Sequence, residues 1–132
     1  MFELGKSLGS FLYYKSRYFY YKTKYPTLSL HFSSRLRNNL IFGDNNSVGK
    51  NTFISDSTLG NNVAVFHDCR LTNVILGDFS GVNSQSQLDF TQIGKFCSLG
   101  FQVLCGCGEH PVNFVSTNSF FYSNFKPRDI TF

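Results

Sequence analysis

His110 is the residue of this sequence that its type and its neighbours best suit to chemistry. It lies between Glu109 and Pro111, directly after the glycine-rich stretch Cys105-Gly106-Cys107-Gly108. An imidazole with a pKa near neutrality can remove the proton of a hydroxyl group as that group attacks a carbonyl carbon. Glu109 could orient the ring, although an exposed turn carboxylate is an equally good interpretation. A histidine before a proline is more often an ordinary surface residue, so its meaning depends on the fold around it.

The cysteines and the other two histidines are weaker candidates for a catalytic or metal-binding role. Four cysteines occur at a spacing that fits no paired zinc pattern: Cys69, Cys97, Cys105 and Cys107. The first residues lack a cleavable signal pattern, so we expect reduced thiols in a cytoplasmic protein. His67 falls at an outward position of the repeat described next, and His31 precedes that repeat. We therefore predict no metal site.

A repeat of 17 residues runs through the middle of the chain from Phe42. Four successive segments begin with an apolar residue followed by glycine, and apolar residues recur at the seventh and thirteenth positions. The three columns are Phe42, Leu59, Leu76 and Ile93; Val48, Val65, Val82 and Leu99; and Ile54, Leu71, Leu88 and Cys105. An ordinary β-sandwich alternates every second residue and would not repeat glycine in register.

This spacing predicts an all-β fold, a parallel β-helix of about four coils. Each apolar residue begins a short strand and points inward, three strands make a triangular coil, and coils stack about 4.8 Å apart. Glycine and asparagine fall where turns need a positive φ or a close approach of the backbone. Phe79 and Phe96 occupy one turn column in successive coils, so their rings are expected to stack.

The repeat and the stretch that follows it resemble one family. Leu59-Gly60-Asn61-Asn62 and Ile93-Gly94-Lys95-Phe96 look like the hexapeptide repeats of the left-handed parallel β-helix acyltransferases. The stretch from Gly106 to Tyr122, with its His-Pro, Ser-Thr and Phe-Tyr pairs, is similar to the branch of xenobiotic and sugar O-acetyltransferases. The resemblance covers residues 40–125. The resemblance implies that the β-helix is left-handed, which the spacing alone does not show.

The resemblance implies transfer of an acetyl group from acetyl-CoA to a hydroxyl of a sugar or polysaccharide precursor. His110 would be the general base, without a covalent acyl-enzyme, and the active site would lie between the prisms of a homotrimer. The residues expected near the acceptor are Glu109, Ser116, Thr117 and Tyr122, and those expected near the thioester are Gly106 and Gly108. Simple loop packing is an equally good interpretation of the acceptor group.

Composition divides the chain into three parts: residues 1–40, an N-terminal capping segment; 41–109, the β-helix domain; and 110–132, the active-site loop and tail. The first part holds seven Lys or Arg and one acidic residue, a net charge of +6, whereas the rest holds five basic and seven acidic residues, a net charge of −2. A nucleic-acid-binding domain would carry its positive charge on the folded body, so no nucleic-acid partner is expected.

The N-terminal segment predicts a helix that ends before Pro26. Leu4, Leu8, Phe11 and Phe19 can share one face of it. Two roles stay open and are compatible. The helix could cap the first coil, or its basic and aromatic residues could give residues 2–24 peripheral contact with a membrane. The second role would place a cytoplasmic protein at the inner membrane surface.

A second interpretation of function is a catalytically incomplete β-helix fragment that serves as a structural or interaction module. Members of the family continue with further coils and a C-terminal cap, whereas this sequence ends at Phe132. Zinc-dependent hydration of CO2, another activity of hexapeptide β-helices, requires three histidines around one metal. The position of His31 before the repeat argues against it.

Overall fold

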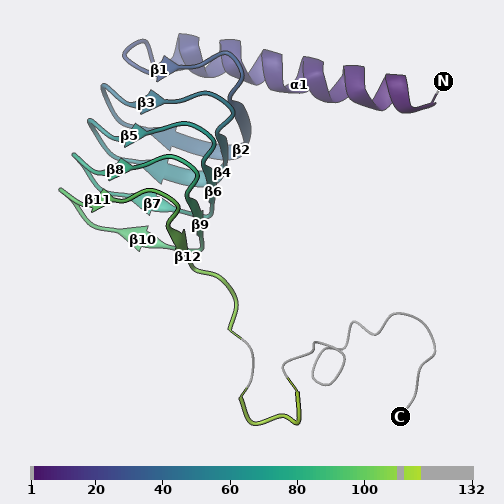
Figure 1. Ribbon diagram of the computed structural model, residues 1–132. Helices are drawn as coiled ribbons and strands as arrows, with labels where there is room; N and C mark the ends of the chain where they lie inside the picture. Colours follow the sequence, from purple (N-terminus) through teal and green to yellow (C-terminus); the bar gives the residue numbers. More distant parts are fainter. Residues whose placement is uncertain (1, 110–111, 117–132) are drawn as a thin grey trace.

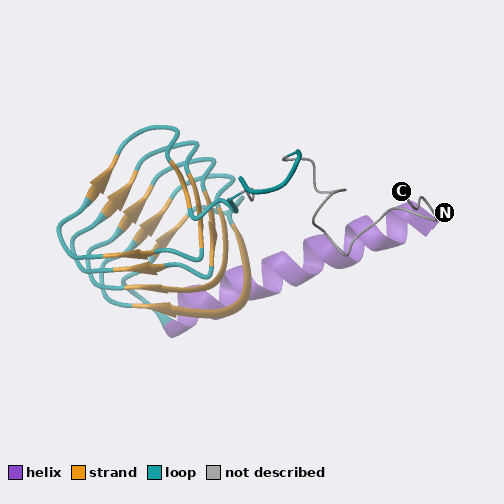
Figure 2. Cartoon of the chain, turned by 90° about the horizontal axis from the view of Figure 1, so that it is seen from below, coloured by secondary structure: helices purple, strands orange, loops and turns teal. Residues whose placement is uncertain are grey.

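The computed structural model describes residues 2–109 and 112–116 and forms a parallel β-solenoid of about five coils, with one helix across its first end (Figure 1). The parallel β-helix predicted from the repeat is thus confirmed, with one coil more than expected. Seen from below, the coils are nested loops of similar outline, and the helix projects to one side (Figure 2).

The strands form two parallel sheets. Five strands pair in the order β1-β3-β5-β8-β11, and seven form a second sheet, β10-β7-β4-β6-β9-β12 with β2 beside β4. The second sheet covers two faces, because β4 pairs with β6 through its first half and with β7 through its second. The elements are α1 (Phe2–Lys24), β1 (Ser29–Leu30), β2 (Arg35–Phe42), β3 (Ser47–Val48), β4 (Phe53–Leu59), β5 (Ala64–Val65), β6 (Arg70–Thr72), β7 (Ile75–Leu76), β8 (Gly81–Val82), β9 (Gln87–Asp89), β10 (Gln92–Ile93), β11 (Ser98–Leu99) and β12 (Leu104–Cys105).

The three predicted apolar columns form the core. In the five-stranded sheet Val48 pairs with Val65, Val65 with Val82, and Val82 with Leu99. The other two columns pair in the same way on the seven-stranded sheet. The first three members of each column are buried, and the fourth member, such as Leu99, is partly buried. Each column is therefore a continuous ladder of inward side chains.

A second set of inward residues is small and polar, and the sequence did not reveal it. Each of these side chains accepts a hydrogen bond from the backbone N–H 17 residues later and donates one to a backbone carbonyl. They are buried and link one coil to the next: Asn46, Thr52, Ser57, Ser80 and Ser86.

Removing one of these links should destabilise the solenoid. The Oγ of Ser80 donates to the Gly94 carbonyl at 2.8 Å and accepts from the Cys97 N–H at 3.0 Å. Ser80→Ala leaves both partners unsatisfied, so the free energy of unfolding should fall by about 1–3 kcal/mol. Ser47→Ala, on the exposed side of β3, is the matched control and should change it by less than about 0.5 kcal/mol. Urea denaturation measures both, and equal effects would contradict the proposed role of the hydroxyl.

The corners of the coils are turned by residues in the left-handed region. Phe79 and Phe96 have φ of 58° and 56°, at a corner that asparagine occupies in earlier coils. Their rings stack as predicted, with centroids 5.1 Å apart and an interplanar angle of 1°. In the glycine column, the residue is required by the close approach of the neighbouring coil and not by a positive φ. A Cβ on Gly77 would lie 2.6 Å from the carbonyl carbon of Gly94, so the next coil approaches too closely for a side chain.

The first coil, formed by β1 and β2, precedes the predicted repeat. Leu30 pairs with Val48, a separation of 18 residues, whereas Phe42 pairs with Leu59, a separation of 17. The additional residue lies at the corner Asn38-Asn39, where the register of β2 against β4 shifts. A repeat of 17 residues therefore cannot be followed toward the N-terminus beyond Phe42, although the coil before Phe42 has the same architecture.

Helix α1 covers the open end of this first coil. Tyr21 is buried and Tyr25 packs against the core, with ring centroids 5.7 and 5.5 Å from that of Phe42. The helix therefore caps the solenoid, which is one of its two predicted roles. The face that docks is a tyrosine face and not the predicted apolar one, since Phe11 and Phe19 of that face stay exposed.

Candidate functional site

The predicted catalytic segment begins where the chain leaves β12. From there the chain runs away from the coils (Figure 1). Its described part includes Gly106, Gly108, Glu109 and Ser116. Three predicted site residues lie outside the described residues: His110, Thr117 and Tyr122. The arrangement of the base around the acceptor and the thioester therefore stays a prediction.

The two glycines of this segment have different surroundings. Gly106 has a φ of 74°, and a Cβ there would overlap the carbonyl oxygen of Asp89. A Cβ on Gly108 would meet no atom within 4 Å. Glycine at position 106 is therefore explained by the corner of the last coil, whereas the space at Gly108 is open enough for a ligand to approach the backbone.

The remaining described residues of the segment lie largely in solvent. Glu109 is exposed and Ser116 is partly buried. Val112 and Val115, which lie between them in the chain, are 94% and 95% exposed. This part of the segment therefore packs little against the coils, and the described residues place neither Glu109 nor Ser116 in a cavity wall.

A groove of about 500 Å³ on the outer face of the five-stranded sheet brings His31 and His67 to one site. His31 precedes the 17-residue repeat of the sequence but lies within the first coil, where its N–H donates to the Val48 carbonyl at 3.0 Å. The Nδ1 of His67 lies 2.7 Å from a carboxylate oxygen of Asp68. This hydrogen bond is the main cause that lowers the pKa of Asp68. An imidazole held at Nδ1 presents Nε2 for proton transfer, so His67 is a second candidate base.

Two observations concern metal ligands and thiols in the part of the chain that the structure describes. No three His, Cys, Asp or Glu side chains there are grouped so that they could hold a metal ion. The thiol of Cys69 donates to the Asn83 carbonyl at 3.2 Å, and burial raises the pKa of that thiol. A buried thiol with a raised pKa is unreactive, so Cys69 serves the packing of the core.

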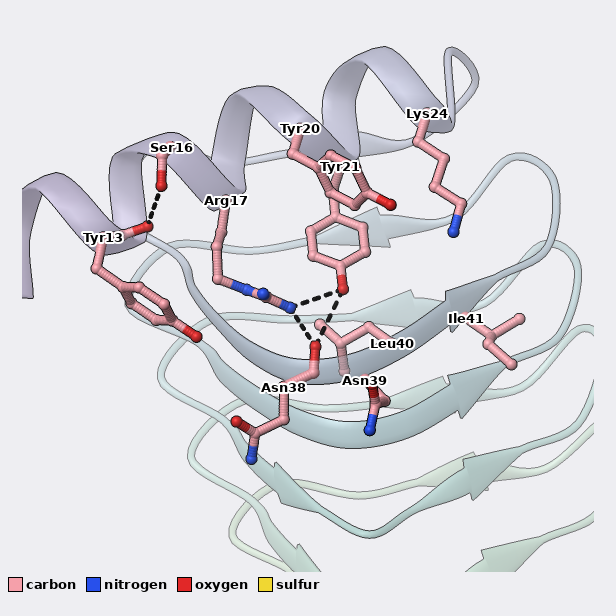
Figure 3. Close-up of a pocket in the computed structure, with 10 residues that line it drawn as sticks. All are labelled: Tyr13, Ser16, Arg17, Tyr20, Tyr21, Lys24, Asn38, Asn39, Leu40 and Ile41. Atoms are coloured by element: carbon pink, nitrogen blue, oxygen red, sulfur yellow. Dashed lines mark hydrogen bonds between the residues drawn. The ribbon is translucent and has the colours of Figure 1, made fainter.

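A second groove, of about 690 Å³, separates α1 from β2 (Figure 3). Arg17 extends from the helix to its floor, where Nη2 donates to the Asn38 carbonyl and, at 2.8 Å, to the phenol oxygen of Tyr21. The Tyr21 hydroxyl donates to the same carbonyl at 3.2 Å. Burial raises the pKa of Tyr21, and the charge of Arg17 opposes that shift. The network ties α1 to the corner at Asn38-Asn39, which carries the additional residue.

Sequence reasoning foresaw neither groove. A signal for the second was present, because Leu30, Leu36 and Phe42 recur every six residues before the predicted repeat. The pair Asn38-Asn39 then marks the corner between Leu36 and Phe42. No comparable signal joins His31 to His67, because they are brought together only by the stacking of coils whose register changes between them.

No known family matches the chain, and no curated protein is significantly similar to it. The likeness to hexapeptide acyltransferases therefore depends on the residues of the repeat and of the Gly106–Tyr122 stretch, together with the parallel solenoid.

Proposed function

We propose that the protein transfers an acetyl group from acetyl-CoA to a hydroxyl of a saccharide, with His110 as general base. The observation that carries the proposal is the combination of a parallel β-solenoid with a Gly-Glu-His-Pro stretch that begins three residues after its last described strand. The fold alone has many functions, and the stretch alone is short. Their occurrence in this order supports the acyltransferase interpretation.

In this mechanism His110 accepts the hydroxyl proton as the sugar oxygen attacks the thioester carbonyl. The tetrahedral intermediate collapses, the carbon–sulfur bond breaks, and the imidazolium returns the proton to the leaving thiolate. The oxyanion requires a donor, usually a backbone N–H. The open space at Gly108 is compatible with such an approach, and Ser116, Thr117 and Tyr122 would contact the acceptor.

Assembly belongs to the same proposal. A prism with flat sheet faces can form a cyclic trimer, which closes without leaving unpaired surfaces. The outer face of the five-stranded sheet carries small residues along its strands, Ser29, Ser47, Ala64, Gly81 and Ser98. Such a face permits close approach of a neighbouring prism, and the groove with His31 and His67, which Ser29 and Ser47 also line, would then lie at the contact.

A second candidate function is a solenoid module without catalysis. In the last described coil Ile93, Leu99 and Cys105 are only partly buried, while their counterparts one coil earlier are fully buried. Among the described residues this end carries no cap, and Phe96 and Leu104 are largely exposed there. An apolar end of this kind is typical of a surface that requires a further layer.

The decisive test is an assay of the purified chain with acetyl-CoA that is labelled in its acetyl group and a panel of saccharides. The label is preferable to a thiol reagent, because Cys107 is a free, exposed thiol that would react with the reagent. We expect labelled saccharide and binding of acetyl-CoA by a trimer. A monomer that neither binds acetyl-CoA nor transfers the label would support the module instead.

A further inference from the structure

Helix α1 has an exposed face that the solenoid does not use. The docked side carries Tyr21, with Tyr18 and Tyr25 beside it. On the opposite side Leu12 and Phe19 are 58% and 62% exposed. These two residues are seven positions apart, which places them on one face of a helix.

The surroundings of this face are open and positively charged. The two views agree that the N-terminal part of α1 extends beyond the coils (Figures 1 and 2). The helix Phe2–Lys24 contains five basic residues and one acidic residue, Glu3, which gives it a net charge of +4. Lys15 and Lys22 lie at one edge of the exposed face, where their ammonium groups donate to the Phe32 and Leu28 carbonyls. Lys24, at the other edge, is exposed.

We propose that α1 lies along the surface of an anionic lipid bilayer, with Leu12 and Phe19 inserted at the level of the headgroups. Aromatic rings prefer that depth, and cations beside them are attracted to lipid phosphates. A second copy of the helix fits this face poorly, because two such helices would bring like charges together. In the described residues no helix is long and apolar enough to cross a bilayer, so the contact is peripheral.

The proposal is tested with the full chain and two kinds of vesicle, phosphatidylcholine alone and an equal mixture of phosphatidylcholine and phosphatidylglycerol. Co-sedimentation should show binding to the mixed vesicles and little to the neutral ones, and high salt should weaken it. The double variant Leu12→Ser/Phe19→Ser should lower the partition coefficient by about tenfold or more, because two inserted apolar side chains are lost.

The matched control is Phe66→Ser/Ile75→Ser, which removes one phenyl and one aliphatic side chain from exposed positions of the solenoid. It should bind vesicles as the wild type does. Circular dichroism should show unchanged helix content in both double variants, since the tyrosine face that holds α1 is intact. The proposal is overturned if the wild type ignores anionic vesicles, or if both double variants lose binding equally. It is likewise overturned if Leu12→Ser/Phe19→Ser binds vesicles as the wild type does. The same holds if the wild type is a dimer that does not bind lipid and the double variant is only converted to a monomer.

Discussion

Leu71→Ala is expected to lower the free energy of unfolding by about 2–5 kcal/mol. Leu71 is 0% exposed and pairs with Ile54 in the coil before and Leu88 in the coil after. Part of the loss is the transfer free energy of the missing carbons, and part is the cavity that remains. The cavity cannot close, because backbone hydrogen bonds to both neighbouring coils fix the spacing of the strands around it.

The control for this prediction is the same substitution at an outward position. Leu104 in β12 is 69% exposed, so Leu104→Ala should change the free energy of unfolding by less than about 0.5 kcal/mol. Urea denaturation of both variants, with the slope against urea compared with that of the wild type, measures the two effects. Equal losses would mean that the column of Leu71 does not form the interior.

His110→Ala is expected to reduce the rate of acetyl transfer by about 10²–10⁴, the usual contribution of a general base. The oligomeric state and the melting temperature should stay unchanged, because the substitution alters none of the three apolar columns that form the core. The wild-type rate should rise with pH as the imidazole loses its proton, since only the neutral ring accepts a proton. The variant should lose that dependence.

Two further histidine variants make the result specific. His31→Ala and His67→Ala alter the groove on the five-stranded sheet, and they should retain most of the activity if His110 is the base. Loss of activity and of its pH dependence in His67→Ala, with His110→Ala active, would instead assign the base to the pair His67 and Asp68. Radiolabel transfer measured over a range of pH separates these outcomes.

The fold could be predicted because its signal is carried by side chains that recur at a fixed interval. The columns through Val65, Leu71 and Leu76 can be recognised in the sequence even when the backbone conformation of the turns between strands is not known. The polar inward residues were missed because serine and threonine give no hydropathy signal. Ser80, for example, resembles any surface serine until its hydrogen bonds to the neighbouring coil are known.

The limits of the other predictions have different physical causes. The first coil was missed because one residue at Asn38-Asn39 shifts the register. The docking face of α1 was assigned to phenylalanine and leucine by hydrophobicity, yet tyrosine docks, because its hydroxyl can reach a backbone carbonyl such as that of Asn38. The candidate base was chosen by likeness to a family, since periodicity places strands and says nothing of a segment that leaves them.

The regular spacing of the coils has a consequence for how such a gene can change in length. From β3 onward, paired residues of neighbouring coils lie 17 residues apart. Gain or loss of one whole unit would therefore preserve every ladder and alter the height of the prism by about 4.8 Å. Gain of a single residue would shift every inward side chain beyond it. The coil under α1 tolerates one because Arg17 and Tyr21 receive the displaced Asn38 carbonyl. The number of coils can therefore vary in the middle of this solenoid. The coil under the helix, in contrast, requires its exact number of residues.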